Sequence, residues 1–233
     1  MEKVWLSWSS GKDSAWALHE LRMDPRFEVA ALFTTVNERF RRIAMHGVRE
    51  SILRAQARAV GLPLHVVPIP WPCSNEEYES HMATLCRAAM AEGIRTFAFG
   101  DLFLEDIREY RVKRLETLGL KAIFPLWRHL TRELATRMIR GGVRARLTCL
   151  DPRKLDPKWI GADFDMEFVE QLPPGVDPCG ENGEFHTCVT GGPMFDYPLE
   201  VHRGEIVERD GFVFIDLIGE EDAEQVSCCE SSL

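Results

Sequence analysis

Short apolar runs alternate with longer amphipathic segments over about the first 125 residues of the chain. The runs have the length of buried strands, and the segments between them repeat apolar positions at helical spacing. Strands are therefore expected at residues 3–8, 28–34, 64–69, 96–99 and 122–124, and helices from residue 13 onward and at residues 48–60, 76–91 and 107–118. This alternation predicts an α/β fold, a Rossmann-like parallel sheet with helices on both faces.

The pattern changes in the second part of the chain. A helix is expected at residues 131–140 and a strand at residues 143–150. Residues 199–207 and 212–218 have strand composition, and Asp210-Gly211 between them is typical of a tight hairpin turn. This part predicts a smaller C-terminal α+β region with an antiparallel hairpin.

These two patterns predict two domains, residues 1–128 and residues 129–233. A glycine- and proline-rich stretch lies at residues 173–193, in a part of the chain whose period shortens toward that of strands. The acidic, serine-rich end from residue 220 onward is expected to be frayed.

Charge and cysteine content narrow the function classes. With 28 basic and 37 acidic residues the net charge is -9, which disfavours nucleic acid as a partner. The seven cysteines form no C-x-x-C pair, so neither a disulfide framework nor a zinc knuckle is indicated. The first residues turn polar too early for a signal peptide, and no apolar run approaches the roughly 20 residues that span a bilayer. These features predict a cytoplasmic protein without a membrane partner.

The clearest chemical signal follows the first expected strand and reads Ser9-Ser10-Gly11-Lys12-Asp13-Ser14. Backbone N–H groups and the helix dipole concentrate positive potential at a helix start. Gly11 permits close approach of an anion, the serine hydroxyls can donate hydrogen bonds, and Lys12 adds a positive charge. Asp13 fits either as a helix cap or as a carboxylate that helps to hold Mg²⁺. The segment predicts a phosphate site, and a plain βα turn capped by Asp13 is the structural alternative.

Further polar positions follow other expected strands, at Thr34-Thr35 and at Gly100-Asp101. In a parallel sheet with helices on both faces, ligands bind beyond the carboxyl ends of the strands. These positions and the segment from Ser9 to Ser14 are therefore expected to face one crevice.

The phosphate segment is not a Walker A loop, because no glycine lies five residues before Gly11 and Asp13 follows the lysine. It resembles instead the PP-loop of the N-type ATP pyrophosphatases, usually written S-G-G-x-D-S, with Ser10 in place of the first glycine. In that family the loop holds the β and γ phosphates as a leaving pyrophosphate while an acceptor oxygen attacks the α phosphate.

The resemblance extends to one branch of this superfamily of adenine nucleotide α-hydrolases, the diphthine ammonia ligase type. The segments that carry it are Met45-His46-Gly47, Phe99-Gly100-Asp101, Pro125-Leu126-Trp127 and Gly180-Glu181-Asn182-Gly183-Glu184-Phe185-His186-Thr187. The resemblance implies a HUP-type ATP-binding domain and a C-terminal domain that closes over the nucleotide and carries the acceptor site. It also implies ATP and Mg²⁺ as cofactors, AMP as a product, and ammonium and a small-molecule or protein carboxylate as further substrates.

Roles for individual residues follow from the same resemblance and from their chemistry. The candidate catalytic residues are Lys12, Asp13, Glu184 and His186, with Asp13 also the candidate metal ligand. The candidate nucleotide-binding residues are Ser9, Ser10, Gly11, Lys12, Asp13, Ser14, Thr34, His46, Gly100 and Asp101. The candidate substrate-binding residues are Tyr110, Arg111 and Glu181.

Structural alternatives stand beside several of these roles. Glu181 and Glu184 could accept backbone hydrogen bonds in a glycine-rich turn. His46 and Asp101 could each cap a following helix. The diphthamide-making enzymes usually carry a tyrosine-glutamine pair before an arginine, whereas this chain keeps only Tyr110-Arg111, so the acceptor is left open.

Three functions fit these patterns. The first is a ligase that adenylates a carboxylate or carbonyl acceptor and amidates it with ammonia. The second is a sulfurtransferase of the PP-loop type, with Cys179 or Cys188 as the nucleophile. The third is an adenine nucleotide sensor without turnover. A homodimer is also left open.

Overall fold

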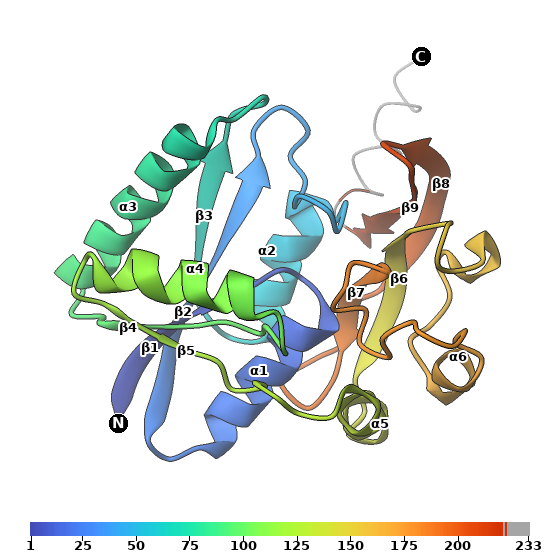
Figure 1. The fold of residues 1–233 in the computed structure, drawn as a ribbon, viewed down its shortest axis with the longest axis horizontal. Helices are drawn as coiled ribbons and strands as arrows, with labels where there is room; N and C mark the ends of the chain where they lie inside the picture. The colour runs from blue at the N-terminus through green and yellow to red at the C-terminus, as the bar shows by residue number, and fades with distance from the viewer. Residues whose placement is uncertain (221, 223–233) are drawn as a thin grey trace.

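The structure is a computed structural model that describes residues 1–220 and residue 222 (Figure 1). Apart from Glu220 and Asp222, the end that was expected to be frayed lies outside the described residues. The elements follow the expected order closely, and in the part of the chain described here no helix has the length and apolar character needed to cross a membrane.

Five parallel strands form the first sheet, in the order β3-β2-β1-β4-β5. Their bounds are β1 Glu2–Ser7, β2 Phe27–Asn37, β3 Leu64–Ile69, β4 Thr96–Ala98 and β5 Lys121–Ile123. The chain moves outward from β1 to β2 and β3, and then returns to the other side of β1 for β4 and β5. The carboxyl ends of β1 and β4 therefore flank the point where the strand order reverses, which is where ligands bind in such sheets.

Helices cover both faces of this sheet, which confirms the predicted Rossmann-like α/β fold (Figure 1). The alternation of side chains along β1 separates the two layers. Val4 and Leu6 pack in one apolar cluster with Leu18 of the first helix, and Trp5 packs on the opposite face with Leu115. The helix bounds are α1 Lys12–Met23 and α2 Glu50–Ala59 on the first face, and α3 Asn75–Ala91 and α4 Glu105–Glu116 on the second.

The C-terminal part forms a second, antiparallel sheet in the order β7-β6-β9-β8, so the predicted α+β character is confirmed. Its elements are α5 Thr131–Arg140, β6 Arg144–Leu150, the 3₁₀ turn Pro157–Trp159, α6 Met166–Glu170, β7 Phe185–Gly191, β8 Val201–Arg209 and β9 Phe212–Gly219. The expected hairpin is β8 and β9, and its turn places Asp210 and Gly211 at φ 54° and 80°, the left-handed region that two-residue hairpins require.

The sequence patterns did not predict β7 as a separate strand, and it lies inside the glycine- and proline-rich stretch at residues 173–193. Two glycines at positive φ, Gly180 and Gly183, turn the chain just before the strand begins. The glycines therefore indicated the turn correctly, but they did not indicate the strand that follows it.

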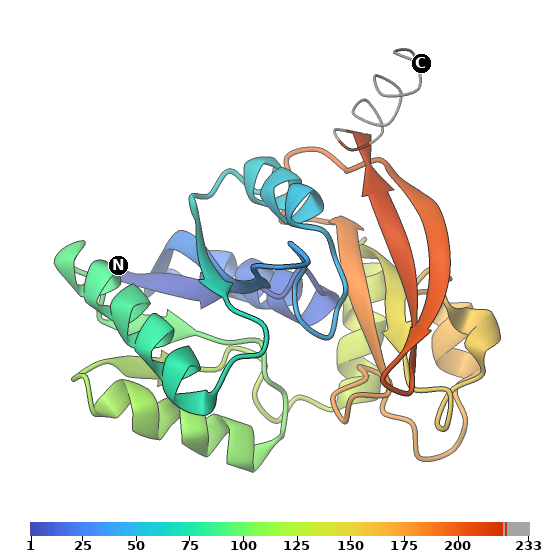
Figure 2. The same cartoon turned by 90° about the horizontal axis from the view of Figure 1, so that it is seen from above.

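The two sheets lie side by side (Figure 2), and they share one apolar core. The cluster that contains Leu18 and Ile52 continues into Leu147, Phe185 and Val189 of the second sheet. Both views place the antiparallel sheet beside the parallel half, with β7 on the side of the phosphate segment. The boundary at residue 128 stays a prediction, because the two parts pack as one interior.

Asp216 in β9 ties the second sheet to the loop that follows β2. Its carboxylate accepts hydrogen bonds from Arg42 at 2.7 Å and from Arg49 at 2.6 Å. Burial alone would raise the pKa of this carboxyl, but the bonds from Arg49 and Arg42 outweigh burial and hold its pKa below the usual range. Asp216 is therefore ionised and paired in the folded protein.

We predict that Asp216→Asn lowers the free energy of unfolding at pH 7 by about 2 kcal/mol, because two charge-assisted hydrogen bonds are weakened. The lowered pKa makes this contribution present above the ordinary carboxyl pKa near 4 and lost as the pH falls below it. Urea unfolding at several pH values measures the difference. Asp163→Asn, at an exposed ion pair with Arg146, is the control and should change little. An equal loss in both variants would contradict the prediction.

Candidate active site

A cavity of about 510 Å³ opens at the carboxyl edge of the parallel sheet, between the phosphate segment and β7. Most of the predicted site residues line it, from both halves of the chain: Ser9, Lys12, Asp13, Ser14, Thr34, His46, Gly100, Asp101, Arg111, Glu181 and His186. The other four, Ser10, Gly11, Tyr110 and Glu184, are not among its lining residues. The fold therefore brings the chemistry-bearing motifs together in one polar cavity.

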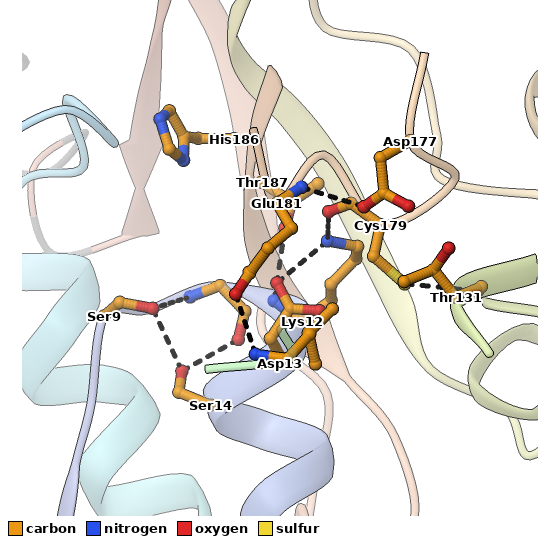
Figure 3. Close-up of polar contacts among 12 residues, drawn as sticks. Ser9, Lys12, Asp13, Ser14, Thr131, Asp177, Cys179, Glu181, His186 and Thr187 are labelled. Carbon is orange, nitrogen blue, oxygen red and sulfur yellow. Dashed lines mark hydrogen bonds and ion pairs between the residues drawn. The ribbon is translucent and has the colours of Figure 1, made fainter. Parts of the chain in front are cut away.

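The phosphate loop, residues 9–14, begins α1 without a side-chain cap. Gly11 is the N-cap residue, so Asp13 stands in the first helical turn and does not cap the helix. The Ser14 hydroxyl donates to the Gly11 carbonyl at 2.9 Å and lies 3.2 Å from the Ser9 hydroxyl (Figure 3). The first N–H groups of a helix have no partner within it, so the start of α1 is suited to bind an anion.

Two positions in the loop have backbone requirements. Ser10 has φ 70°, a left-handed conformation that glycine adopts more readily than serine, and this explains why the resembling loops carry glycine there. Gly11 is hemmed in, because a Cβ atom at that position would lie 2.9 Å from Cε1 of His46 and 3.3 Å from the Thr187 carbonyl oxygen. The loop is therefore packed directly against β7 and the loop that carries His46.

Lys12 is buried and points toward the second half of the chain (Figure 3). Its Nζ donates to Asp13 Oδ2 at 2.9 Å and to the Cys179 carbonyl oxygen, and it lies 5.2 Å from the ring centres of Phe164 and Phe185. Burial alone would lower the pKa of this amine, but the neighbouring Asp13 carboxylate outweighs burial and raises it. Lys12 is therefore a fixed positive charge at the base of the cavity.

Asp13 has one oxygen in use and one without a partner. Oδ2 binds Lys12, while Oδ1 is buried with no hydrogen-bond partner. Burial raises the pKa of this carboxyl and the Lys12 charge opposes the rise. A lone buried carboxylate oxygen fits a ligand of Mg²⁺, which often takes one or two protein carboxylates and completes its shell with phosphate oxygens and water. Among the described residues no group of three or more His, Cys, Asp or Glu could hold a metal ion without such help.

Asp101 and Arg111 form a second charged pair at the cavity wall. Asp101 Oδ2 and Arg111 Nε lie 2.9 Å apart, and the guanidinium stands 4.4 Å from the ring centre of Phe99. Asp101 does not cap α4, whose N-cap residue is Leu104. Tyr110, next to Arg111 in sequence, is 44% exposed and lines a neighbouring cavity between α3 and α4.

Glu181 reaches across from the second half to the loop after β4. Its Oε1 accepts from the Leu102 N–H at 2.7 Å, and its own N–H donates to Asp177 Oδ2 at 2.9 Å. Burial raises the pKa of Glu181 to about 7, with smaller contributions from the Asp13 and Asp101 carboxylates. This side chain thus changes its charge close to neutral pH.

The rings of His46 and His186 lie against each other with their centres 4.6 Å apart and their planes tilted by 39°. His46 Nδ1 lies 3.2 Å from the Thr187 carbonyl oxygen, and it does not cap α2, whose N-cap residue is Arg49. Burial lowers the pKa of His46 to about 4 and that of His186 well below its usual range. Both rings are therefore neutral at pH 7, and the buried His186 Nε2 has no hydrogen-bond partner.

Glu184 holds the glycine-rich turn in place. Its Oε1 accepts from the Asp177 N–H and from Asn182 Nδ2, both at 3.2 Å, as in the structural alternative given for this residue. Its Oε2 is buried without a hydrogen-bond partner. Glu181 therefore faces the cavity, whereas Glu184 supports the turn that presents it.

The sequence patterns missed Gln56 of α2. This side chain is fully buried and bonds to Trp8, to Ser10 and to the main chain of Val189 in β7. A single glutamine within a helix belongs to no motif, and only the fold brings it under the loop.

Together, the strand order, the cavity at the reversal point and the loop after β1 define a Rossmann-like α/β protein with a helix start suited to bind an anion. Comparison with known families then shows to which family of such proteins the chain belongs. The Diphthamide synthase N-terminal domain matches residues 2–122 and the Diphthamide synthase C-terminal domain matches residues 131–218. The first match alone covers more than half of the chain, so the chain belongs to the diphthamide synthase family.

The individual relatives described next share one name. The chain is 27% identical to the "Diphthine--ammonia ligase" of Bos taurus over 176 residues, which are 68% of this chain and 65% of the relative. It is 28% identical to the protein of that name from Homo sapiens over 148 residues, 61% of this chain and 55% of the relative. The chain thus spans less than two thirds of the length of these relatives.

We predict that the free energy of unfolding falls as the pH decreases from 6.5 to 4. Over this range the unfolded chain protonates His46 at its ordinary pKa near 6.5, while the folded protein holds that pKa near 4, so acid favours unfolding. His46→Gln should recover about 1–3 kcal/mol of this loss at pH 4.5.

Chemical denaturation of both proteins across this pH range measures the effect. His202→Gln, at an exposed position of β8, is the control and should keep the wild-type slope. A His46→Gln variant with an unchanged slope would show that another group is responsible.

Proposed function

We propose that this protein is an AMP-forming ligase that uses ATP to activate a carboxylate and then amidates it with ammonia. The observation that carries the proposal is the loop after β1, which places a helix start, Lys12 and an unpartnered carboxylate oxygen of Asp13 at one cavity. The family and the names of the relatives support the same reaction class.

In the first step the acceptor carboxylate oxygen attacks the α phosphorus of ATP, and the bond from that phosphorus to the bridging oxygen of pyrophosphate breaks. We infer that the phosphate loop and Lys12 hold the departing pyrophosphate, whose charge needs preorganised donors. We assign Thr34, His46 and Gly100 to the nucleotide. Bound Mg²⁺ would neutralise part of the triphosphate charge, with Asp13 Oδ1 as its protein ligand.

In the second step ammonia attacks the acyl carbon, the carbon–oxygen bond to AMP breaks, and the nitrogen loses a proton. We assign His186 to contact the acceptor, because its ring is neutral and its Nε2 is buried without a partner, and the proton that the nitrogen loses passes to the departing AMP or to water. We infer that Glu181 and Arg111 contact the acceptor or ammonium, and that Glu184 acts by fixing the turn that carries Glu181. Tyr110 would contact only the outer part of a larger acceptor.

We propose a carboxylate as the acceptor, small or borne by a protein, and diphthine is the first to test because the relatives carry its name. A cytoplasmic location and a second copy of the chain as partner belong to the same proposal. Nucleic acid is not proposed, given the net charge of -9.

Sulfur transfer is the weaker alternative. Burial raises the pKa of the Cys188 thiol to about 12 and that of Cys179 higher still, whereas a nucleophilic cysteine needs a lowered pKa. The Cys179 thiol instead donates to the Thr131 carbonyl at 3.3 Å. A nucleotide sensor stays a second candidate, since the same loop could bind ATP without turnover.

We predict that repeated release of pyrophosphate from ATP requires both a suitable carboxylate acceptor and ammonium, that the acceptor without ammonium supports no more than one turnover, and that Asp13→Asn lowers the rate at least about 100-fold. A coupled pyrophosphate assay over a set of carboxylates, diphthine included, measures both. Asp106→Asn, exposed in the first turn of α4, serves as the control. Tight ATP binding without turnover would support the sensor, and a fully active Asp13→Asn variant would remove this carboxylate from the mechanism.

We also predict that ATP binds more tightly at pH 6 than at pH 8, by about threefold to tenfold. The Glu181 pKa is near 7 without ligand, and the charge of a bound triphosphate raises it further, so binding takes up a proton. Calorimetry in two buffers of different ionisation enthalpy counts that proton. Glu181→Gln should bind with less pH dependence, and comparison of the two proteins cancels the ionisation of ATP itself. Equal pH dependence in both would refute the coupling.

A further inference from the structure

The amide of Gln56 lies between the phosphate loop and β7, with every polar atom in use. Its Oε1 accepts from Trp8 Nε1 at 2.9 Å and from the Ser10 hydroxyl at 2.6 Å. Its Nε2 donates to the Ser10 carbonyl at 3.2 Å and to the Val189 carbonyl at 2.6 Å. A fully buried and satisfied amide of this kind fixes the geometry of the groups around it.

The Gln56 amide forms two hydrogen bonds to Ser10, whose backbone is strained. Ser10 adopts the left-handed conformation that disfavours side chains, and such conformations persist only where the surroundings impose them. Gln56 bonds to both the hydroxyl and the carbonyl of Ser10, and Val189 N–H donates to the same carbonyl at 2.8 Å. Ser10, Gln56 and Val189 therefore form a closed set of hydrogen bonds across the two halves of the chain.

Gln56 does not line the cavity, so it would act on a ligand only through the loop. The groups that face the cavity from this loop are Ser9 and the first residues of α1, and their directions depend on the turn at Ser10. Methionine has nearly the same volume as glutamine but would leave Trp8 Nε1 and the Val189 carbonyl without their partner. Glutamate would keep the acceptor oxygens and lose the two N–H donors.

We propose that Gln56 is a positioning residue that sets the phosphate loop in the shape that binds the β and γ phosphates. This inference rests on the proposed function. It implies that the loop is complete only when β7 of the second half is in place, because the same amide bonds to both. The effect of Gln56 is then specific to the pyrophosphate part of the ligand.

The test compares the binding of three probes, ATP, AMP and inorganic pyrophosphate, each with Mg²⁺, by calorimetry on the full chain. We expect Gln56→Met to weaken ATP and pyrophosphate by roughly 10- to 100-fold and AMP by less than about threefold, since misplaced contacts of this kind cost up to about 100-fold. Gln56→Glu should show the same order of loss. Leu53→Val, buried in the same helix without a polar contact, is the control for lost stability, and Gln171→Met is the surface control.

Equal affinities of Gln56→Met and Leu53→Val for all three probes, at a comparable loss of thermal stability, would overturn the inference. A uniform loss for all probes would do the same. If wild-type protein binds neither ATP nor pyrophosphate, the proposed function itself fails, whatever the variants do. Should the Gln56 variants not fold, hydrogen exchange on wild-type protein decides: pyrophosphate must slow exchange at the Val189 N–H, and unchanged exchange there would overturn the inference.

Discussion

The docking of β7 against the turn at Ser10 is the constraint on which the site depends. A left-handed serine, a glycine with no room for a side chain and a buried lysine occur within three residues, and none would hold its place alone. The second sheet supplies what they lack: Val189 binds the Ser10 carbonyl, Thr187 Oγ1 accepts from the Lys12 N–H at 3.1 Å, and the Cys179 carbonyl accepts from Lys12 Nζ. The conformation of the phosphate loop therefore depends on contacts from both halves of the chain.

Electrostatics gives the cavity a second constraint. Asp13, Asp101 and Glu181 bring three carboxyl groups to a space whose two cations, Lys12 and Arg111, are already paired with aspartates. A triphosphate entering this space adds negative charge to negative charge unless a divalent cation or a proton comes with it. The unpartnered oxygen of Asp13 is suited to bind the cation, and Glu181, whose pKa is raised, is suited to take up the proton. The neutral histidines add no charge, which suits groups that must exchange protons or contact a base.

Much of this arrangement could be predicted from the sequence, because local patterns specify it. The alternation of strands and helices predicted the parallel sheet. The polar positions after β1 and β4 predicted a shared crevice, since the carboxyl ends of parallel strands meet at one edge. The structure confirms the fold and leaves the individual roles as proposals. What the sequence could not reveal arises from contacts distant along the chain. Gln56 and Val189 are 133 residues apart, β7 was concealed behind glycine turns, and Glu184 and Glu181 look alike in the motif but face different surroundings.

The shared apolar core between the sheets bears on how such a protein can change over time. A domain with an apolar core of its own can be exchanged for an unrelated domain by recombination. Here the apolar interior of α1 and α2 continues into β6 and β7, so a foreign C-terminal half would have to reproduce that packing residue by residue. New ligand specificities are therefore expected to arise through single substitutions around the cavity mouth, while the packing between the two halves stays the same.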